Sequence, residues 1–116
     1  MNFPAIDENL SVDLMDKMTQ NASLASRMLK AISHESRLMI LCHLVAGEKS
    51  VSELEALLSI RQAAVSQQLA RLRLEGLVET RRDGKNILYC LADRRAKRLL
   101  ELLYELYCAP ETADEV

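Results

Sequence analysis

The chain has 116 residues, of which 49% are hydrophobic and 28% are charged, proportions that are ordinary for one soluble globular domain. No apolar run approaches the roughly 20 residues that a membrane-spanning helix needs, and the acidic N-terminal region lacks the basic and apolar segments of a signal peptide. These features argue against an integral membrane protein and predict a cytoplasmic protein without a membrane partner.

Two helices are predicted in the N-terminal part of the chain, after a tail at residues 1–8. The first covers residues 9–31, with a break near Asn21. The second runs from about residue 34 to residue 46, with Ser33 as its expected cap, because a serine hydroxyl accepts a hydrogen bond from a free N–H of the first turn. Apolar side chains recur along one face of this second helix, at Leu38, Leu41, Cys42 and Val45.

A helix-turn-helix is predicted next. A short helix ends near Leu58 and begins with Ser50 or Ser52 as its cap. Residues 59–61 form the turn, and a longer helix follows over residues 62–75. Its buried stripe is expected at Val65, Leu69 and Leu72, and its outward face at Gln62, Ala63, Ser66, Gln67 and Arg71.

A β-hairpin follows the longer helix. Gly76 is expected to end the helix, since glycine tolerates the left-handed backbone of a helix C-terminus. Strands are predicted at residues 77–82 and 86–91. Asp83-Gly84 lies between them and favours a tight turn, because such turns require residues that tolerate positive φ.

The last predicted helix runs from about residue 93 to residue 107, and residues 110–116 form a second tail. One domain therefore spans residues 9–109. In so small a domain, the long apolar stripe of the last helix can be buried only against the first helix or against a partner subunit. This stripe consists of Leu99, Leu102, Leu103 and Leu106.

Basic charge is concentrated around the longer helix and the hairpin. Residues 61–98 contain ten Lys and Arg against four Asp and Glu, so this segment carries +6 while the rest of the chain carries −8. A polar helix face followed by a basic two-stranded ribbon suits the major groove of DNA and the flanking phosphates. The alternative is a solvated basic face without a partner. The predicted contacts to double-stranded DNA are Gln62, Ala63, Ser66, Gln67, Gln68 and Arg71 on the helix, and Arg81, Arg82 and Lys85 on the hairpin.

These elements predict a mainly α fold with a small β-hairpin, a winged helix-turn-helix. The segments LKAISHESRLMILCHLV and VSQQLARLRLEGLVETRRDGKNILY resemble the ArsR/SmtB family of winged-helix repressors, and the similarity extends over about residues 24–107. One departure is Gln68, where many members carry histidine, although glutamine keeps donor and acceptor groups. The resemblance implies a homodimer through the first and last helices, which binds an inverted-repeat operator and represses transcription.

The metal sites of the family are not expected in this chain. The family's cysteine motif corresponds here to Ser50-Val51-Ser52, and serine is a poor replacement for a thiolate ligand. The last helix contains no histidine, and His34 and His43 are nine residues apart. We therefore expect neither a metal site nor a cofactor, and we interpret His34 as a hydrogen-bonding residue at a helix start.

Three cysteines, Cys42, Cys90 and Cys108, are an odd number in a reducing compartment, where a structural disulfide is not favoured. Cys42 and Cys108 resemble the dithiol branch of the family, whose matching cysteines respond to persulfides or oxidants. The resemblance implies that a persulfide or polysulfide inducer joins the two thiols by a disulfide or polysulfide bridge and releases DNA, with sulfide-detoxification genes as targets. A packing role is the alternative for Cys42, and Cys90 is interpreted as a packing residue.

Functions of other classes remain as alternatives. An enzyme would need Cys42 and His43 as nucleophile and base, but adjacent residues of a helix point about 100° apart and no oxyanion loop accompanies them. A protein-interaction module without DNA binding conflicts with the outward glutamine, serine and arginine side chains. A general thiol redox regulator and a metal-responsive repressor are the remaining alternatives.

Overall fold

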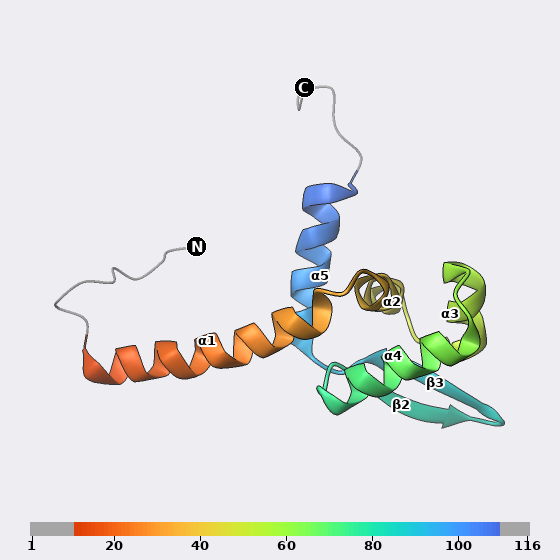
Figure 1. Ribbon diagram of the computed structural model, residues 1–116, viewed down its shortest axis with the longest axis horizontal. Coiled ribbons are helices and arrows are strands. Elements are labelled where there is room, and N and C mark those ends of the chain that lie inside the picture. The colour runs from red at the N-terminus through yellow and green to blue at the C-terminus, as the bar shows by residue number, and fades with distance from the viewer. Residues whose placement is uncertain (1–10, 110–116) are drawn as a thin grey trace, which may run out of the picture.

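The structure is a computed structural model that describes residues 11–109, which form five helices and three strands (Figure 1). The tails predicted at residues 1–8 and 110–116 lie outside the described residues. The elements are α1 (Val12–Ile32), α2 (Glu35–Val45), β1 (Lys49–Ser50), α3 (Val51–Leu58), α4 (Gln62–Leu74), β2 (Val78–Asp83), β3 (Asn86–Leu91) and α5 (Arg94–Tyr107).

Helix α2 occupies the centre of the molecule (Figure 1) and packs against α1, α3, α4, α5 and β3. Its residues Ile40 and Leu41 are fully buried. The buried stripe predicted for α4 is confirmed, because Val65, Leu69 and Leu72 have no exposed surface. Burial of each such side chain stabilises the fold by about 1.5–3 kcal/mol. Helix α4 is therefore held on the core by its apolar side, and its polar side remains available.

Side chains cap the starts of α3 and α5. The Ser50 hydroxyl accepts a hydrogen bond from the Glu53 N–H at 3.2 Å, and the Glu53 carboxylate accepts one from the Ser50 N–H at 3.0 Å. This reciprocal pair is a capping box, so Ser50 rather than Ser52 is the cap. At α5 the Asp93 carboxylate accepts from the N–H groups of Arg95 and Ala96.

Two details of the N-terminal prediction are wrong. Helix α1 runs through Asn21 without a break, because a single asparagine in an exposed helix costs at most about 0.7 kcal/mol relative to alanine. Ser33 does not cap α2, since its own backbone is helical and its hydroxyl donates to the Lys30 carbonyl at 3.0 Å. His34, whose backbone is extended, takes the N-cap position instead.

The predicted hairpin is confirmed, but it belongs to a three-stranded antiparallel sheet with the order β1-β3-β2. Strand β1 has only two residues and pairs Lys49 with Tyr89 and Ser50 with Leu88, so it is too short to produce an alternating pattern in the sequence. Asp83 lies within β2, and the turn consists of residues 84 and 85. Gly84 has a φ of +64°, which residues with a Cβ rarely adopt.

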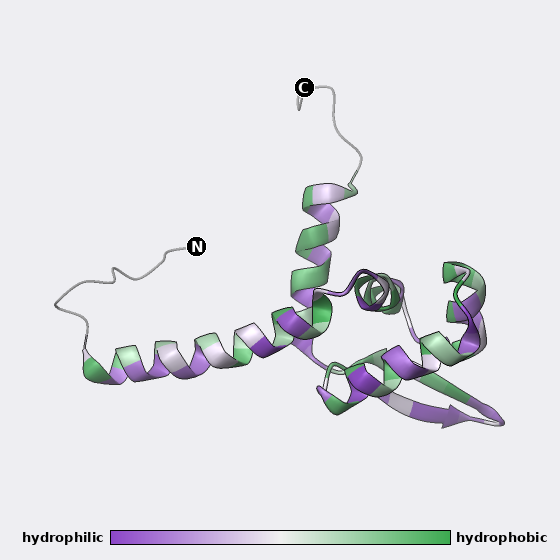
Figure 2. Ribbon diagram, viewed as in Figure 1, coloured by the Kyte–Doolittle hydropathy of each residue, from purple (hydrophilic) through white to green (hydrophobic). Residues whose placement is uncertain are grey.

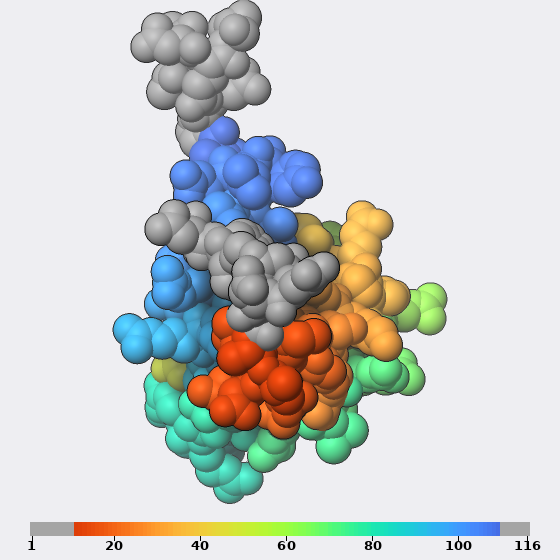
Figure 3. Space-filling model, turned by 90° about the vertical axis from the view of Figure 1, so that its left-hand side faces the viewer, coloured from red at the N-terminus to blue at the C-terminus, as the bar shows by residue number. Residues whose placement is uncertain are grey.

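Helices α1 and α5 project from the core in different directions (Figure 1). The radius of gyration is 17.6 Å, whereas a compact domain of this length has about 13 Å. Apolar residues recur along both helices (Figure 2), and in the space-filling view α1 points toward the viewer with α5 above it (Figure 3). Within residues 11–109, no helix combines the length and the apolar character needed to cross a membrane. On these two helices the most exposed apolar side chains are Val12, Met15 and Leu29 of α1, and Tyr104, Leu106 and Tyr107 of α5.

Candidate nucleic-acid interface

Helix α4 presents a polar face on the side opposite its buried stripe. Gln62, Ala63, Gln67 and Arg71 are exposed, whereas Ser66 is half-buried. Helix α3 packs against α4, and the turn between them contains Ser59 with a φ of +54°. The two helices thus form the predicted helix-turn-helix, and the outer face of α4 offers amide and guanidinium groups that match the donors and acceptors of base edges.

Gln68 differs from the other helix residues predicted to contact DNA. Its side chain is half-buried, and its amide oxygen accepts a hydrogen bond from Nη1 of Arg37 on α2 at 3.3 Å. The structure therefore directs Gln68 toward α2, away from the exposed face that Gln67 and Arg71 occupy.

The wing consists of β2, β3 and the turn between them, and it extends beyond the core (Figure 1). Arg81, Arg82 and Lys85 are all exposed on it, but Arg81 and Arg82 lie on opposite faces because consecutive side chains of a strand alternate. Nε of Arg81 donates to the two carboxylate oxygens of Glu48 at 3.0 and 2.8 Å. These hydrogen bonds from Arg81 hold the pKa of Glu48 below its ordinary value. Among residues 11–109, Arg82 and Lys85 form no ion pair.

Three residues that shape this interface were not predicted from the sequence. Arg61 is the exposed N-cap residue of α4, where the helix dipole disfavours a positive charge. That unfavourable position is the signal that could have indicated a nearby phosphate, because a helix N-terminus attracts anions. Arg37 and Glu48 pair with residues 31 and 33 positions away, so no local pattern reveals them.

Cys42 and Cys108 lie close together in the structure. Cys42 is half-buried on α2, Cys108 is the exposed C-cap residue of α5, and these two helices pack against each other. Burial raises the pKa of the Cys42 thiol, and the nearby charge of Cys108 raises this pKa further. Both thiols therefore lie on packed helices of one protomer.

Cys90 lies apart from this pair, on β3. Its half-buried thiol donates to Oε1 of Glu79 at 3.8 Å. Burial, together with the carboxylates of Glu79 and Glu48, raises the pKa of Cys90. A thiol that stays protonated is a weak nucleophile, so this environment suits the packing role predicted for Cys90.

His34 stands at the N-cap of α2, and its Nδ1 lies 2.9 Å from the hydroxyl oxygen of Ser36. This hydrogen bond agrees with the interpretation of His34 as a residue of the helix start. In the part of the chain that the structure describes, no group of three or more His, Cys, Asp and Glu side chains is arranged to hold a metal ion.

The α3–α4 helix-turn-helix followed by the β2–β3 wing defines a winged helix-turn-helix protein, a class that binds DNA. Residues 34–80 match the family model described as bacterial regulatory protein, arsR family. A biofilm growth-associated repressor of Agrobacterium fabrum is 51% identical over 94 residues, which cover 81% of this chain and 80% of that protein.

Two further relatives have solved structures. The transcriptional activator HlyU of Vibrio cholerae is 44% identical over 81% of this chain and 87% of that protein. The structure of reduced HlyU matches with a TM-score of 0.77, over 80% of this chain and 98% of that one. The transcriptional repressor BigR of Xylella fastidiosa matches with a TM-score of 0.75 at 45% identity, over 83% of this chain and 98% of that one.

This chain belongs to the ArsR family of bacterial regulatory proteins. The predicted resemblance and the predicted winged helix-turn-helix fold are both confirmed. Because its relatives are DNA-binding transcription regulators, the enzyme alternative for Cys42 and His43 is rejected.

Proposed function

We propose that this chain is a homodimeric repressor whose affinity for operator DNA is controlled by the thiols of Cys42 and Cys108. The reduced dimer binds an inverted-repeat operator, and a persulfide or polysulfide inducer releases it. The cytoplasm is the proposed location, and sulfide-detoxification genes are the proposed targets. The observation that supports the proposal most directly is that α5, which ends at Cys108, packs on α2, which carries Cys42, in a chain of the ArsR family.

The proposed dimer uses the projecting helices α1 and α5. Leu106 and Tyr107 of α5 are 66% and 82% exposed, and Val12 of α1 is 73% exposed. Removing such apolar surface from water stabilises an assembly by roughly 25 cal/mol per Å². A two-fold dimer would present two copies of α4, which suits the two halves of an inverted repeat.

In the proposed complex the outer face of α4 enters the major groove. Arg71 can donate two hydrogen bonds to guanine, and Gln62 or Gln67 can form a bidentate pair with adenine, each worth roughly 1–3 kcal/mol of discrimination. Ala63 suits the methyl group of thymine. Arg82 and Lys85 on the wing contact phosphate, and Arg81 does so after leaving Glu48.

The proposed sensing reaction begins at the exposed thiol. The Cys108 thiolate attacks the outer sulfur of a persulfide RS–SH, which leaves Cys108 as a persulfide and releases the thiol RSH. Cys42 then attacks the inner sulfur of Cys108, so that a disulfide forms and hydrogen sulfide leaves. If both thiols first become persulfides, their condensation gives a trisulfide bridge and releases hydrogen sulfide.

Such a bridge ties the C-terminal end of α5 to α2. Helix α2 is the central helix and also contacts α3 and α4. Because α5 belongs to the proposed dimer interface, a shift of α5 on α2 changes the separation of the two α4 helices. Half-sites have a fixed spacing on the duplex, so a changed separation lowers affinity for the operator.

The DNA-binding part of the proposal is tested with Arg71→Ala. We expect operator affinity to fall by about tenfold or more, the value of one lost bidentate contact. Arg73→Ala is the matched control, since Arg73 is also exposed on α4 but two residues further along, on another side of the helix. Fluorescence anisotropy with a labelled operator measures both variants, and an Arg71→Ala protein with unchanged affinity would contradict this assignment of α4.

The sensing part is tested by intact mass spectrometry and operator binding, before and after a persulfide donor or hydrogen peroxide. We expect Cys42→Ser and Cys108→Ser to bind the operator and to lose the response, while the matched control Cys90→Ser keeps it. Modification of Cys42 and Cys108 by the persulfide donor but not by hydrogen peroxide supports a reactive-sulfur sensor. If both reagents produce the same disulfide, the protein is a general thiol redox regulator instead. A Cys108→Ser protein that still responds fully to the persulfide donor overturns the dithiol proposal.

A further inference from the structure

We infer that Arg37 is a positioning residue, which fixes the recognition helix α4 against the projecting helix α1 by its hydrogen bond to Gln68. The inference rests on the proposed function, in which α4 binds the operator and α1 belongs to the dimer interface. It assigns to Gln68 a role in the spacing of the two recognition helices instead of a base contact.

The guanidinium of Arg37 joins three acceptors from two helices. Its Nε donates to the Ala31 carbonyl at 2.6 Å, its Nη2 donates to the Lys30 carbonyl at 3.4 Å, and its Nη1 donates to Oε1 of Gln68 at 3.3 Å. Both carbonyls lie in the last turn of α1, where carbonyl groups have no N–H partner within the helix. Arg37 therefore caps α1 and holds α4 with the same planar group.

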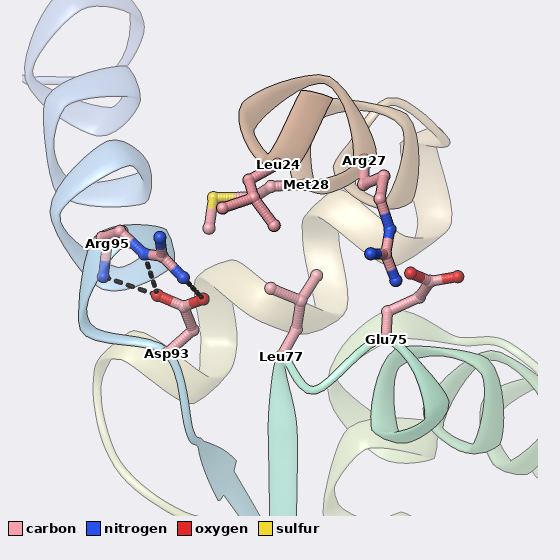
Figure 4. Close-up of a pocket in the computed structure, with 7 residues that line it drawn as sticks. All are labelled: Leu24, Arg27, Met28, Glu75, Leu77, Asp93 and Arg95. Atoms are coloured by element: carbon pink, nitrogen blue, oxygen red, sulfur yellow. Dashed lines mark hydrogen bonds and ion pairs between the residues drawn. The ribbon is translucent and has the colours of Figure 1, made fainter. Parts of the chain in front are cut away.

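The remainder of the junction between α1 and α4 is loosely filled. A cavity of about 120 Å³ separates α1 from the end of α4 and the start of α5, and Leu24, Met28 and Leu77 line its apolar side (Figure 4). In the same view Arg27 of α1 points toward Glu75, the C-cap residue of α4 (Figure 4). A second cleft of about 140 Å³ lies between Arg27, Lys30 and Ala31 of α1 and Arg71 and Glu75 of α4.

Along these open clefts, side chains of α1 face solvent and do not form the dispersion contacts that would hold two helices at one angle. Beyond the apolar packing of Ala31 and Ile32 in the core, the angle between α1 and α4 thus depends on a directional polar contact. Since α1 meets the partner subunit in the proposed dimer, this angle sets the separation of the two recognition helices and hence the half-site spacing that the dimer accepts.

Base contact and positioning predict different behaviour of Gln68→Met, which keeps the size of the side chain and removes the acceptor. A lost base contact relaxes the preference at one base pair and leaves the spacing preference intact. A lost positioning contact relaxes the spacing preference and leaves the base preference intact. Gln67→Met is the matched control, because Gln67 is adjacent, is exposed and carries the same amide.

The test uses the full-length reduced protein and operators in which the half-site spacing differs by one or two base pairs. The variants are Arg37→Gln, Arg37→Lys, Gln68→Met, the double variant Arg37→Gln with Gln68→Met, and Gln67→Met. Binding is measured by anisotropy, base preference by selection from a randomised half-site, and integrity of the fold by thermal unfolding.

We expect Arg37→Gln and Gln68→Met each to lower affinity for the preferred spacing by roughly three- to tenfold. The double variant should lose no more affinity than the single variant with the larger loss, because the two residues form one coupled contact. Both should bind altered spacings relatively better than the wild-type protein does. Arg37→Lys should behave like Arg37→Gln, because an ammonium group lacks the planar fork that reaches two helices. Gln67→Met should change the preference at one base pair only.

The inference is overturned if Gln68→Met alters one base preference without altering the spacing preference, or if the two single effects multiply in the double variant. Gln68→Met decides the matter alone if the Arg37 variants fail to fold. A wild-type protein that binds no DNA, or an Arg71→Ala variant with unchanged affinity, refutes the proposed function instead, so the two failures are distinguishable.

Discussion

The cysteines of the proposed sensor differ in how their thiols meet solvent. Cys108 is exposed, whereas Cys42 is half-buried. Burial and the nearby charge of Cys108 raise the pKa of Cys42, which reduces the fraction of reactive thiolate on Cys42 at neutral pH. The two residues therefore suit successive steps of one reaction, first attack by Cys108 and then resolution by Cys42.

This difference predicts an order of alkylation. With limiting iodoacetamide near neutral pH, we expect Cys108 to be modified before Cys42. Since the raised pKa keeps Cys42 protonated, its alkylation rate should still increase as the pH passes about 8.5, the ordinary value for a free cysteine. Peptide mass spectrometry over a pH series measures both rates. The Cys108→Ser variant should react somewhat faster at Cys42, because it lacks the neighbouring charge, and preferential labelling of Cys42 in the wild-type protein would contradict the prediction.

In the proposed complex Glu48 competes with DNA for Arg81, because a carboxylate and a phosphate bind the same N–H edge of a guanidinium group. In the variant Glu48→Gln, Arg81 loses its charged partner. We expect tighter binding to DNA of any sequence and a slope of log affinity against log salt that is steeper by about one. Glu101→Gln on α5 makes the same change of net charge away from the wing and is the control. Equal salt slopes in the two variants would show that the Glu48–Arg81 pair does not limit binding.

The end of α4 determines how the recognition helix leads into the wing. The Leu77 N–H donates to the Leu72 carbonyl and the Gly76 N–H donates to the Arg73 carbonyl, both at 3.0 Å. Gly76 has a φ of +76°. This pattern is a Schellman motif, which satisfies the free carbonyls of the helix end and turns the chain toward β2.

Gly76→Ala should destabilise the protein by about 1–2 kcal/mol, because an L-residue with a Cβ disfavours the left-handed backbone. No atom lies within 4 Å of a Cβ added at Gly76, so the cost arises from the backbone alone. Gly76→Asn should lose less, since asparagine tolerates this conformation better than alanine. Urea unfolding followed by circular dichroism gives the free energies, and an alanine variant as stable as the wild type would exclude the motif.

At the scale of the whole molecule, α1 and α5 expose apolar surface that one chain does not cover. This exposure, together with the radius of gyration of 17.6 Å, supports the proposed dimer as the unit that binds DNA. The two functions of the chain are then separated in space, because α4 and the wing lie on one part of the molecule while α1 and α5 project from it (Figure 1).

Leu106→Glu should weaken the dimer, because it places a charge in the proposed apolar interface of α5. The matched control is Leu74→Glu, which makes the same substitution at a leucine on α4 that is 89% exposed. Sedimentation equilibrium is the measurement, and we expect the first variant to shift toward monomer at a concentration where the control remains dimeric. A dimeric Leu106→Glu protein would place the interface elsewhere.

The sequence alone determined most elements and their ends, because these depend on residues a few positions apart. The apolar spacing of Val65, Leu69 and Leu72 predicted the buried side of α4, and Gly76 and Gly84 marked the end of that helix and the hairpin turn. The outward glutamines and Arg71 followed from the same helical period. Ser33 was assigned wrongly, because two neighbouring polar residues compete for one helix start and only the backbone geometry distinguishes them.

Only the tertiary structure decided which distant residues meet. Arg37 and Gln68 are 31 residues apart, Arg81 and Glu48 are 33 apart, and β1 pairs with β3 across the helix-turn-helix. The closeness of Cys42 to Cys108 also requires that α5 packs on α2, which the resemblance implied but no local pattern encodes. Such pairs depend on how the core brings helices together, and the apolar periodicity that builds the core does not specify which polar side chains become neighbours at its edge.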